Sequence, residues 1–211
     1  MDYEVRPEQP VDREDVLRVI AAAFGAQSVE HGESVADIWA RLGHHRRAGL
    51  VVEQGGHVLG HVGLSRAWVD ARRALVEVWV LSPLSVEPDR QGRGVGTALV
   101  AAAVETARGS GVPVLFLEGS PVYYGARGFE RADQRGFLPA ALERTPRAAF
   151  QCVLFEGREE WMSGQLVYPD VWWDHDAAGL RDPVLAELEE RFAAVPAEPD
   201  ETGPGAPADR D

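Results

Sequence analysis

The chain has 211 residues, of which 45% are hydrophobic and 26% are charged, and its formal net charge is -13. This length and composition predict one sizeable globular domain followed by a tail. So large a negative charge argues against binding to nucleic acid phosphates or to acidic lipid. It favours a small cationic or amine-bearing partner.

Cysteine usage and targeting patterns bear on the compartment. Cys152 is the only cysteine, which excludes an internal disulfide and a cysteine-based zinc site. The segment 1–6 lacks the basic and apolar regions of a signal peptide, and no apolar run is long enough for a membrane span. No metal is expected, because the motif 174–176 (Asp-His-Asp) lacks a fourth clustered ligand. We therefore expect a cytoplasmic protein that binds neither membrane nor nucleic acid.

Hydrophobic periodicity predicts two helices and then a hairpin in the first third of the chain. In chain order the expected elements are a strand at 3–6, a helix at 11–24, a second helix capped by Ser34 that carries Ile38, Trp39 and Leu42, and strands at 50–53 and 57–64. The three residues 54–56 (Gln-Gly-Gly) predict the hairpin turn, because glycine tolerates the positive φ angles of tight turns.

A longer strand is predicted at 74–86, with bulky residues on both faces, as in a central strand covered on both sides. Pro83 cannot donate a hydrogen bond to a neighbouring strand. We therefore expect the pairing to be interrupted or bulged at 82–85.

The second half of the chain predicts further alternation of helix and strand. The expected elements are a helix at 95–108, a strand at 112–118, a short helix at 123–127, strands at 129–138 and 149–155, and a further strand within 161–168. The end, 196–211, is rich in Pro, Gly, Ala and Asp and is expected to be disordered.

Gly92, Gly94 and Gly96 stand where the central strand passes into a helix, and they predict an anion site. Glycines let backbone N–H groups approach an anion closely, and the first turn of a helix has unsatisfied donors. A P-loop is excluded because no lysine follows. A dinucleotide fingerprint is weakened because its third glycine is missing, although Glu118 ends the next strand as a ribose-binding acid would. A glycine-rich helix entry without a ligand remains an alternative.

The segment 84–99 resembles the acetyl-CoA-binding signature of the GNAT N-acetyltransferase superfamily. Its pattern Gln/Arg-x-x-Gly-x-Gly/Ala is met by Gln91, Gly94 and Gly96. A second segment, 124–129, resembles the family's Tyr-x-x-x-Gly-Phe motif. The resemblance implies a mixed α/β fold with a central, mostly antiparallel, V-splayed sheet flanked by helices.

The resemblance also implies a division of the chain. Residues 1–156 would form the acetyltransferase core, 157–195 a C-terminal extension that packs on the core, and 196–211 the tail. Four aromatic residues of the extension either wall a substrate cleft or bury the extension against the core; they are Trp161, Tyr168, Trp172 and Trp173. Exposed sheet edges and this aromatic extension favour a homodimer.

Roles for single residues follow from the same resemblance. The backbone of Leu84, Ser85 and Val86 would meet the pantetheine arm of the cofactor. Its pyrophosphate would be held by Gln91, Gly92, Arg93, Gly94, Val95, Gly96 and Thr97. Tyr124 would protonate the departing coenzyme A thiolate. The chain departs from the family at two places. Many members have an asparagine just after the fifth strand, whereas 118–121 is Glu-Gly-Ser-Pro here. Histone-modifying members have a glutamate base at the position that Val80 occupies here.

A bulge before the loop also has a chemical consequence. It would free a backbone N–H, that of Val86, to polarise the thioester carbonyl. Glu118 is a candidate general base if burial raises its pKa, and otherwise it hydrogen-bonds loop amides. Glu77 is expected to pair with an arginine. His31 and Glu33 either contact substrate or lie in a solvated link between the first two helices.

We therefore expect an N-acetyltransferase that moves the acetyl group of acetyl-CoA to a primary amine of a small molecule, by direct transfer in a ternary complex. The alternatives are a protein or peptide N-acetyltransferase and a non-catalytic acyl-CoA-binding sensor. A nicotinamide-dependent dehydrogenase is a weaker alternative.

Overall fold

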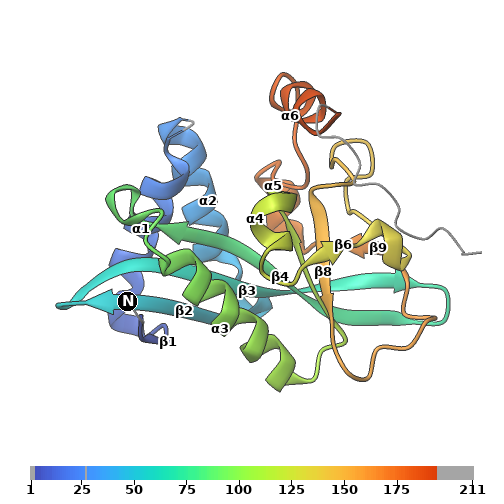
Figure 1. Ribbon diagram of the computed structural model, residues 1–211, viewed down its shortest axis with the longest axis horizontal. Coiled ribbons are helices and arrows are strands. Elements are labelled where there is room, and N and C mark those ends of the chain that lie inside the picture. Colours follow the sequence, from blue (N-terminus) through green and yellow to red (C-terminus); the bar gives the residue numbers. More distant parts are fainter. Residues whose placement is uncertain (1–2, 27, 194–211) are drawn as a thin grey trace, which may run out of the picture.

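The computed structural model describes residues 3–26 and 28–193. The predicted disordered tail, 196–211, lies outside this part of the chain, as do the last two residues of the predicted extension. Within the described residues, strands form one mixed sheet with helices on both faces (Figure 1). Among these residues no helix combines the length and the apolar character needed to cross a bilayer.

Most strand pairs of the sheet are antiparallel, as expected. The strand order is β1-β2-β3-β4-β5-β8-β6, and β9 pairs with β3 and β7 off this path. The two parallel pairs are β4 with β5 and β7 with β9. The strands are β1 (Val5–Pro7), β2 (Arg46–Gln54), β3 (His57–Ala71), β4 (Leu75–Val86), β5 (Val114–Glu118), β6 (Glu130–Arg131), β7 (Phe137–Leu138), β8 (Phe150–Leu154) and β9 (Gly164–Val167).

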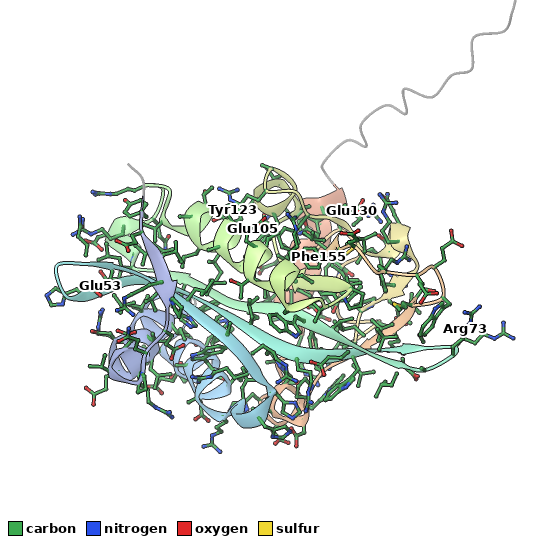
Figure 2. All side chains as sticks on the ribbon, turned by 90° about the horizontal axis from the view of Figure 1, so that it is seen from below. Glu53, Arg73, Glu105, Tyr123, Glu130 and Phe155 are labelled. Carbon is green, nitrogen blue, oxygen red and sulfur yellow. The ribbon has the colours of Figure 1, made fainter. Side chains whose placement is uncertain are left out.

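Helices cover the two faces of the sheet unequally. Those described are α1 (Arg13–Phe24), α2 (Val29–Arg41), α3 (Val95–Ser110), α4 (Pro121–Gly125), α5 (Asp170–Asp174) and α6 (Val184–Ala193), with short 3-10 turns η1 (Pro10–Asp12), η2 (Gly43–His45), η3 (Pro88–Arg90) and η4 (Asp133–Arg135). Figure 2 shows α3 above the sheet and α1 and α2 below it, with Glu53 and Arg73 at opposite ends.

The sheet separates two hydrophobic clusters. Val16, Ile20 and Trp39 of α1 and α2 belong to the first cluster, with α5 and the inner face of β8. Leu99 and Ala103 of α3 belong to the second. Strand residues alternate between the two clusters, because side chains of a strand point to opposite faces in turn. We call these the α1/α2 face and the α3 face.

The predicted bulge is present in β4. Val62 pairs with Leu84 but Leu64 pairs with Leu81, so β4 has one residue more than β3 across this step. The extra residue reverses the alternation of β4. Val78 and Val80 therefore face α1/α2, whereas Leu84, after the bulge, faces α3.

The V-splay of the sheet lies next to this bulge. β4 and β5 pair only at Trp79 with Leu115 and at Val80 with Phe116. Beyond Val80, β4 continues to Val86 along β3, and β5 continues along β8. The two parallel strands thus separate at the end of β4 that precedes the glycine loop.

Two predictions of local structure were wrong. Helix α2 begins at Val29 rather than after Ser34, because Ser28 has an extended backbone and its Oγ accepts a hydrogen bond from His31 N at 3.1 Å. His31 and Glu33 therefore belong to a helix and not to a link. The single strand predicted at 129–138 is broken into β6 and β7 by η4, which ends at Gly136 with a φ of 83°.

The described part of the segment 157–195 contacts the sheet and α2. Strand β9 pairs with the end of β3, from Trp68 with Val167 to Ala71 with Gly164. Beyond β9, His175 Nε2 lies 2.9 Å from Asp37 Oδ2 of α2. The proposed domain boundaries themselves stay a prediction.

Substitution of Phe116 tests how much the hydrophobic cluster on the α1/α2 face contributes to the free energy of unfolding. Phe116 is fully buried, stacked on Phe150 at 5.3 Å between ring centroids and edge-on to Phe137 at 4.9 Å. Phe116→Ala should lower the free energy of unfolding by about 3–5 kcal/mol, because it removes buried area and leaves a cavity. Urea unfolding measures this. The control Val122→Ala, at a side chain 77% exposed, should change it by less than about 0.5 kcal/mol. Equal effects would contradict the assigned core.

Candidate active site

The glycine loop forms the entry to α3. Gly94 is the N-cap of the helix with a φ of 93°, and Gly92 has a φ of 72°. Ala98 N donates to Gly94 O at 3.0 Å, which is the first bond of the helix. The N–H groups of Val95, Gly96 and Thr97 lie in the first turn, where an α-helix has no acceptor for them. These donors and the positive end of the helix dipole form an anion site.

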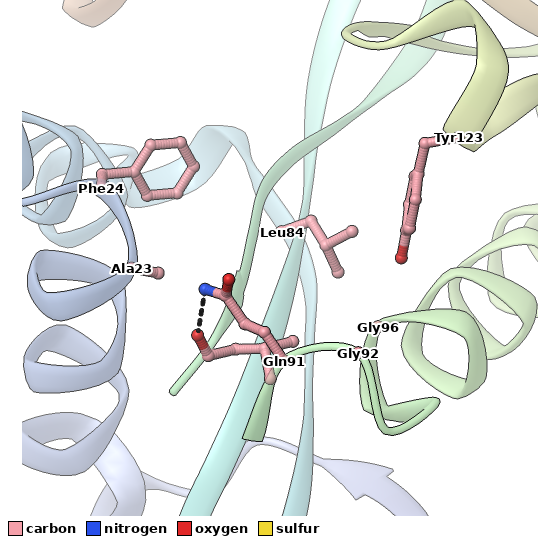
Figure 3. A pocket seen from close by; sticks show the side chains of 8 residues that line it. Ala23, Phe24, Leu84, Gln91, Gly92, Gly96 and Tyr123 are labelled. Carbon is pink, nitrogen blue, oxygen red and sulfur yellow. Dashed lines mark hydrogen bonds between the residues drawn. The ribbon is translucent and has the colours of Figure 1, made fainter. Parts of the chain in front are cut away.

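A pocket of about 340 Å³ lies between this loop and α1 (Figure 3). Its lining comes from α1 on one face of the sheet and from α3 and α4 on the other. The lining residues are Ala23, Phe24, Leu84, Val86, Gln91, Gly92, Gly96 and Tyr123. The pocket thus occupies the place where β4 has left β5. Pockets that hold small ligands commonly have volumes of this order.

The backbone of Val86 points into this opening rather than toward β3. Glu87 N donates to Leu59 O at 2.9 Å, so the neighbouring pair of Val86 with Gly60 is a non-hydrogen-bonded pair of the antiparallel ladder. Both backbone groups of Val86 then face away from β3. Its C=O accepts a hydrogen bond from Gln91 Nε2 at 3.2 Å, as Figure 3 shows.

Other members of the predicted cofactor set lie around the same loop. Leu84 and Val86 line the pocket, whereas the hydroxyl of the buried Ser85 turns away and donates to His61 O at 3.3 Å. Val95 is buried and Arg93 is exposed. Thr97 Oγ1 accepts a hydrogen bond from Arg127 Nη2 at 2.6 Å.

Tyr123 lines the pocket and is not among the site residues predicted from the sequence. A Cβ on Gly96 would lie 2.6 Å from Tyr123 Oη, so the missing side chain makes room for this hydroxyl at the start of α3. The guanidinium of Arg127 lies 3.6 Å from the centroid of the Tyr123 ring.

Tyr124 lies beside Tyr123 and packs on the end of β5. Its ring is 4.9 Å from that of Tyr123 and 5.7 Å from that of Phe129, and a Cβ on Gly119 would lie 2.5 Å from it. Burial raises the pKa of Tyr124 above its ordinary value, so the phenol stays protonated near neutral pH.

Glu118 ends β5 and accepts two side-chain hydrogen bonds. Tyr168 Oη donates to Glu118 Oε1 at 2.9 Å, and Thr145 Oγ1 lies 3.4 Å from Glu118 Oε2. Burial raises the pKa of Glu118, while Tyr168, Thr145 and the charge of Arg144 lower it. The partners are hydroxyls and not loop amides, and no pattern around Thr145 or Tyr168 indicated them.

The remaining candidates have other partners. Glu77 pairs with Arg47 at 3.0 Å, as expected. His31 packs edge-on to Phe24, with ring centroids 5.9 Å apart. In the described part of the chain no three His, Cys, Asp or Glu residues are grouped to hold a metal ion. His175, which the sequence placed between two aspartates, contacts Asp37 and Val171 O instead.

Two glycine-to-alanine variants of α3 test the left-handed backbone of Gly94, because the two glycines differ in conformation. Gly94→Ala should lower the free energy of unfolding by about 1–2 kcal/mol, because a side chain at φ 93° is strained. Gly109→Ala, where no atom lies within 4 Å of the added Cβ, should raise it by about 0.5–1 kcal/mol. Thermal and urea unfolding measure both, and a Gly94→Ala protein as stable as the original would refute the loop geometry.

Comparison with known proteins agrees with this geometry. The family model described as acetyltransferase (GNAT) family matches residues 14–133, more than half of the chain. The uncharacterized N-acetyltransferase YjhQ of Escherichia coli K12 is 29% identical over 119 residues, which are 56% of this chain and 65% of that protein. The chain thus spans just under two thirds of the length of this curated relative.

Two solved structures extend the comparison. A GNAT family acetyltransferase from Brucella melitensis, in complex with acetyl-CoA, has a TM-score of 0.63 and 27% identity, covering 81% of this chain and 98% of that one. YhbS, a GNAT family N-acetyltransferase from Escherichia coli in complex with CoA, has a TM-score of 0.68 and 21% identity, covering 81% and 91%. From the matched family model and the shared fold, the chain belongs to the GNAT N-acetyltransferase family.

Proposed function

We propose that this protein transfers the acetyl group of acetyl-CoA to a primary amine of a small molecule, by direct transfer in a ternary complex. The observation that carries the proposal is the pocket at the separation of β4 from β5, with unsatisfied helix donors on one side and Tyr123 on the other, and with Tyr124 packed beside Tyr123. The similar Brucella melitensis acetyltransferase, crystallised with acetyl-CoA, supports the choice of donor.

The residues at the loop fit the pyrophosphate of acetyl-CoA. A Cβ on Gly92 would meet no atom within 4 Å, and one on Gly94 would meet only the edge of Tyr3, so the backbone is open to a bulky anion. The first-turn donors of α3 supply hydrogen bonds, and Arg93 and Arg127 bring positive charge to the same helix end. When bound, acetyl-CoA supplies the electrophilic thioester.

Two groups of the chain would act on the reacting atoms. The N–H of Val86 faces the opening and is suited to donate to the thioester carbonyl oxygen as negative charge develops there. Tyr124 is suited to give its proton to the departing thiolate, because burial keeps the phenol in its proton-donating form. Since a thiolate is a weaker base than a phenolate, this transfer has to be coupled to loss of the proton that the attacking amine releases. Holding both substrates in one pocket contributes by proximity.

The proposal of a small amine as acceptor rests on charge and on one departure from the family. The chain is strongly acidic, which favours a cationic acceptor. Val80 stands where the family's histone-modifying members have a glutamate base, and this argues against that protein-lysine mechanism. Cytoplasmic location and homodimer formation stay predictions.

A free-thiol release assay with acetyl-CoA tests the proposed function directly. We expect turnover with small primary amines, polyamines or aminoglycosides, and slower turnover with peptide pools. Faster turnover with peptides would make the protein a peptide N-acetyltransferase. Tight acetyl-CoA binding without turnover over the whole panel would make it a sensor, and a thermal shift with NAD but not acetyl-CoA would refute the family-based donor.

Phenylalanine variants of the two adjacent tyrosines distinguish a role in acid catalysis from a role in cofactor binding. Tyr124→Phe should lower kcat by about 100-fold or more, with the Kd for CoA unchanged, because only the proton donor is removed. Tyr123→Phe should act mainly on the KM for acetyl-CoA, because its hydroxyl lies at the start of α3. Steady-state kinetics and calorimetric CoA titration measure these effects. If Tyr123→Phe carried the loss of kcat instead, Tyr124 would not be the acid.

A further inference from the structure

We propose that Tyr168 and Thr145 are positioning residues that hold the Glu118 carboxylate on the acceptor side of the active site, where it binds the acceptor as an ammonium ion and takes its proton. This inference rests on the proposed function and deepens it. It makes the segment after β9, whose role the sequence left open, part of the catalytic apparatus.

Strand alternation places Glu118 on the acceptor side. Leu115 and Leu117 of β5 belong to the α3 face, whereas Val114 and Phe116 belong to the α1/α2 face. Glu118 continues the second set, so its side chain projects to the face opposite the cofactor loop. Phe24 of α1 reaches the pocket from the same face. Glu118 does not line the pocket but keeps part of its surface accessible, so an acceptor that approaches from this face could reach it without crossing the cofactor.

Glu118 is also adjacent in the fold to the proposed acid. Tyr124 packs directly on Gly119, the residue after Glu118. Gly119 is fixed on both sides, because its N–H donates to Ala149 O at 2.9 Å and its C=O accepts from Gln151 Nε2 at 3.1 Å. Gly119 therefore links the Glu118 carboxylate on the α1/α2 face to the Tyr124 phenol, which belongs to the α3-face cluster.

Tyr168 is held in place by its own packing. It follows β9, which is paired with β3, and it is 6% exposed and stacked on Trp172 with ring centroids 5.1 Å apart. The Glu118–Tyr168 hydrogen bond joins the end of β5 to the residue that follows β9. Thr145, 4% exposed, holds the other carboxylate oxygen.

These hydrogen bonds leave capacity for a ligand. An ionised carboxylate has about four acceptor positions, and the two hydroxyls use one on each oxygen. The titratable and charged groups that act on Glu118 within the described chain are Tyr168 and Arg144. Arg144 is itself paired with Asp176 at 3.2 Å, so its positive charge is shared between Asp176 and Glu118. A primary ammonium, with three donors, fits the remaining positions.

Burial makes the Glu118 carboxylate a stronger base than an exposed one. Burial raises the pKa of Glu118, and the two hydroxyl donors limit the rise because they favour the ionised form. One proton passes from the ammonium to the carboxylate, which leaves a neutral amine with a lone pair for attack on the thioester carbon. Glu118 then returns the proton to solvent.

Tyr168→Phe tests the positioning role through pH. Removing the hydroxyl takes away a bond that lowers the pKa of Glu118, so the pKa should rise further, by about one unit. Since the ionised form is the active one, the acidic limb of kcat/KM should move to higher pH by the same amount. Thr145→Val should act in the same direction. Thr106→Val, at a hydroxyl that bonds only within α3, should leave the limb in place.

Two further measurements test the positioning role of Tyr168 independently of whether the protein is an acetyltransferase. Titration of ¹³C-labelled glutamate carboxyls, with Glu118→Gln identifying the signal, reports the pKa of Glu118 without turnover. An unchanged carboxyl pKa in Tyr168→Phe would overturn the positioning role even if the enzyme is active. In a Glu118→Gln background, Tyr168→Phe should change kcat/KM by less than two-fold. A loss as large as in the original background would show that Tyr168 serves only the fold.

Discussion

The separation of β4 from β5 beyond Val80 is the constraint on which the candidate site depends. Two parallel strands that stay paired would have used the backbone groups of both in ladder hydrogen bonds. Here β5 stays paired with β8 and β4 stays paired with β3, while the two strands separate from each other. The edge of β4 that would have paired with β5 is therefore open where β4 approaches the glycine loop. A pocket that reaches both faces of the sheet lies at this place.

The bulge in β4 gives that edge its chemistry. The extra residue opposite β3 reverses the alternation, so Leu84 and Val86 turn toward α3 while Ser85 turns back to His61. Helix α3 can begin directly above, because Gly60 of β3 has no side chain and a Cβ there would lie 2.9 Å from Val95. The strand end, the loop and the helix start are therefore held in one arrangement by packing, which is what pre-organised catalysis requires.

Much of this could be predicted from local patterns. The turn at Gly55 and Gly56, the break at Pro83 and the glycine entry to α3 depend on backbone requirements that single residues disclose, and all three are present in the structure. The start of α2 was misplaced because Ser28 and Ser34 are both acceptable caps, and only the packing of Gly32 against α1 favours the earlier one. The partners of Glu118 lie 27 and 50 residues away, and contacts of that kind are set by tertiary packing and have no local signal.

In the proposed mechanism the opening beside β4 directs a thioester toward the N–H of Val86. A crystal structure with acetyl-CoA tests this most directly. We expect the thioester carbonyl oxygen at about 2.9 Å from Val86 N and the pyrophosphate on the first-turn N–H groups of α3. An acetyl-CoA molecule bound away from the α3 start, or with its carbonyl turned from Val86, would show that this opening is not the acetyl-transfer site.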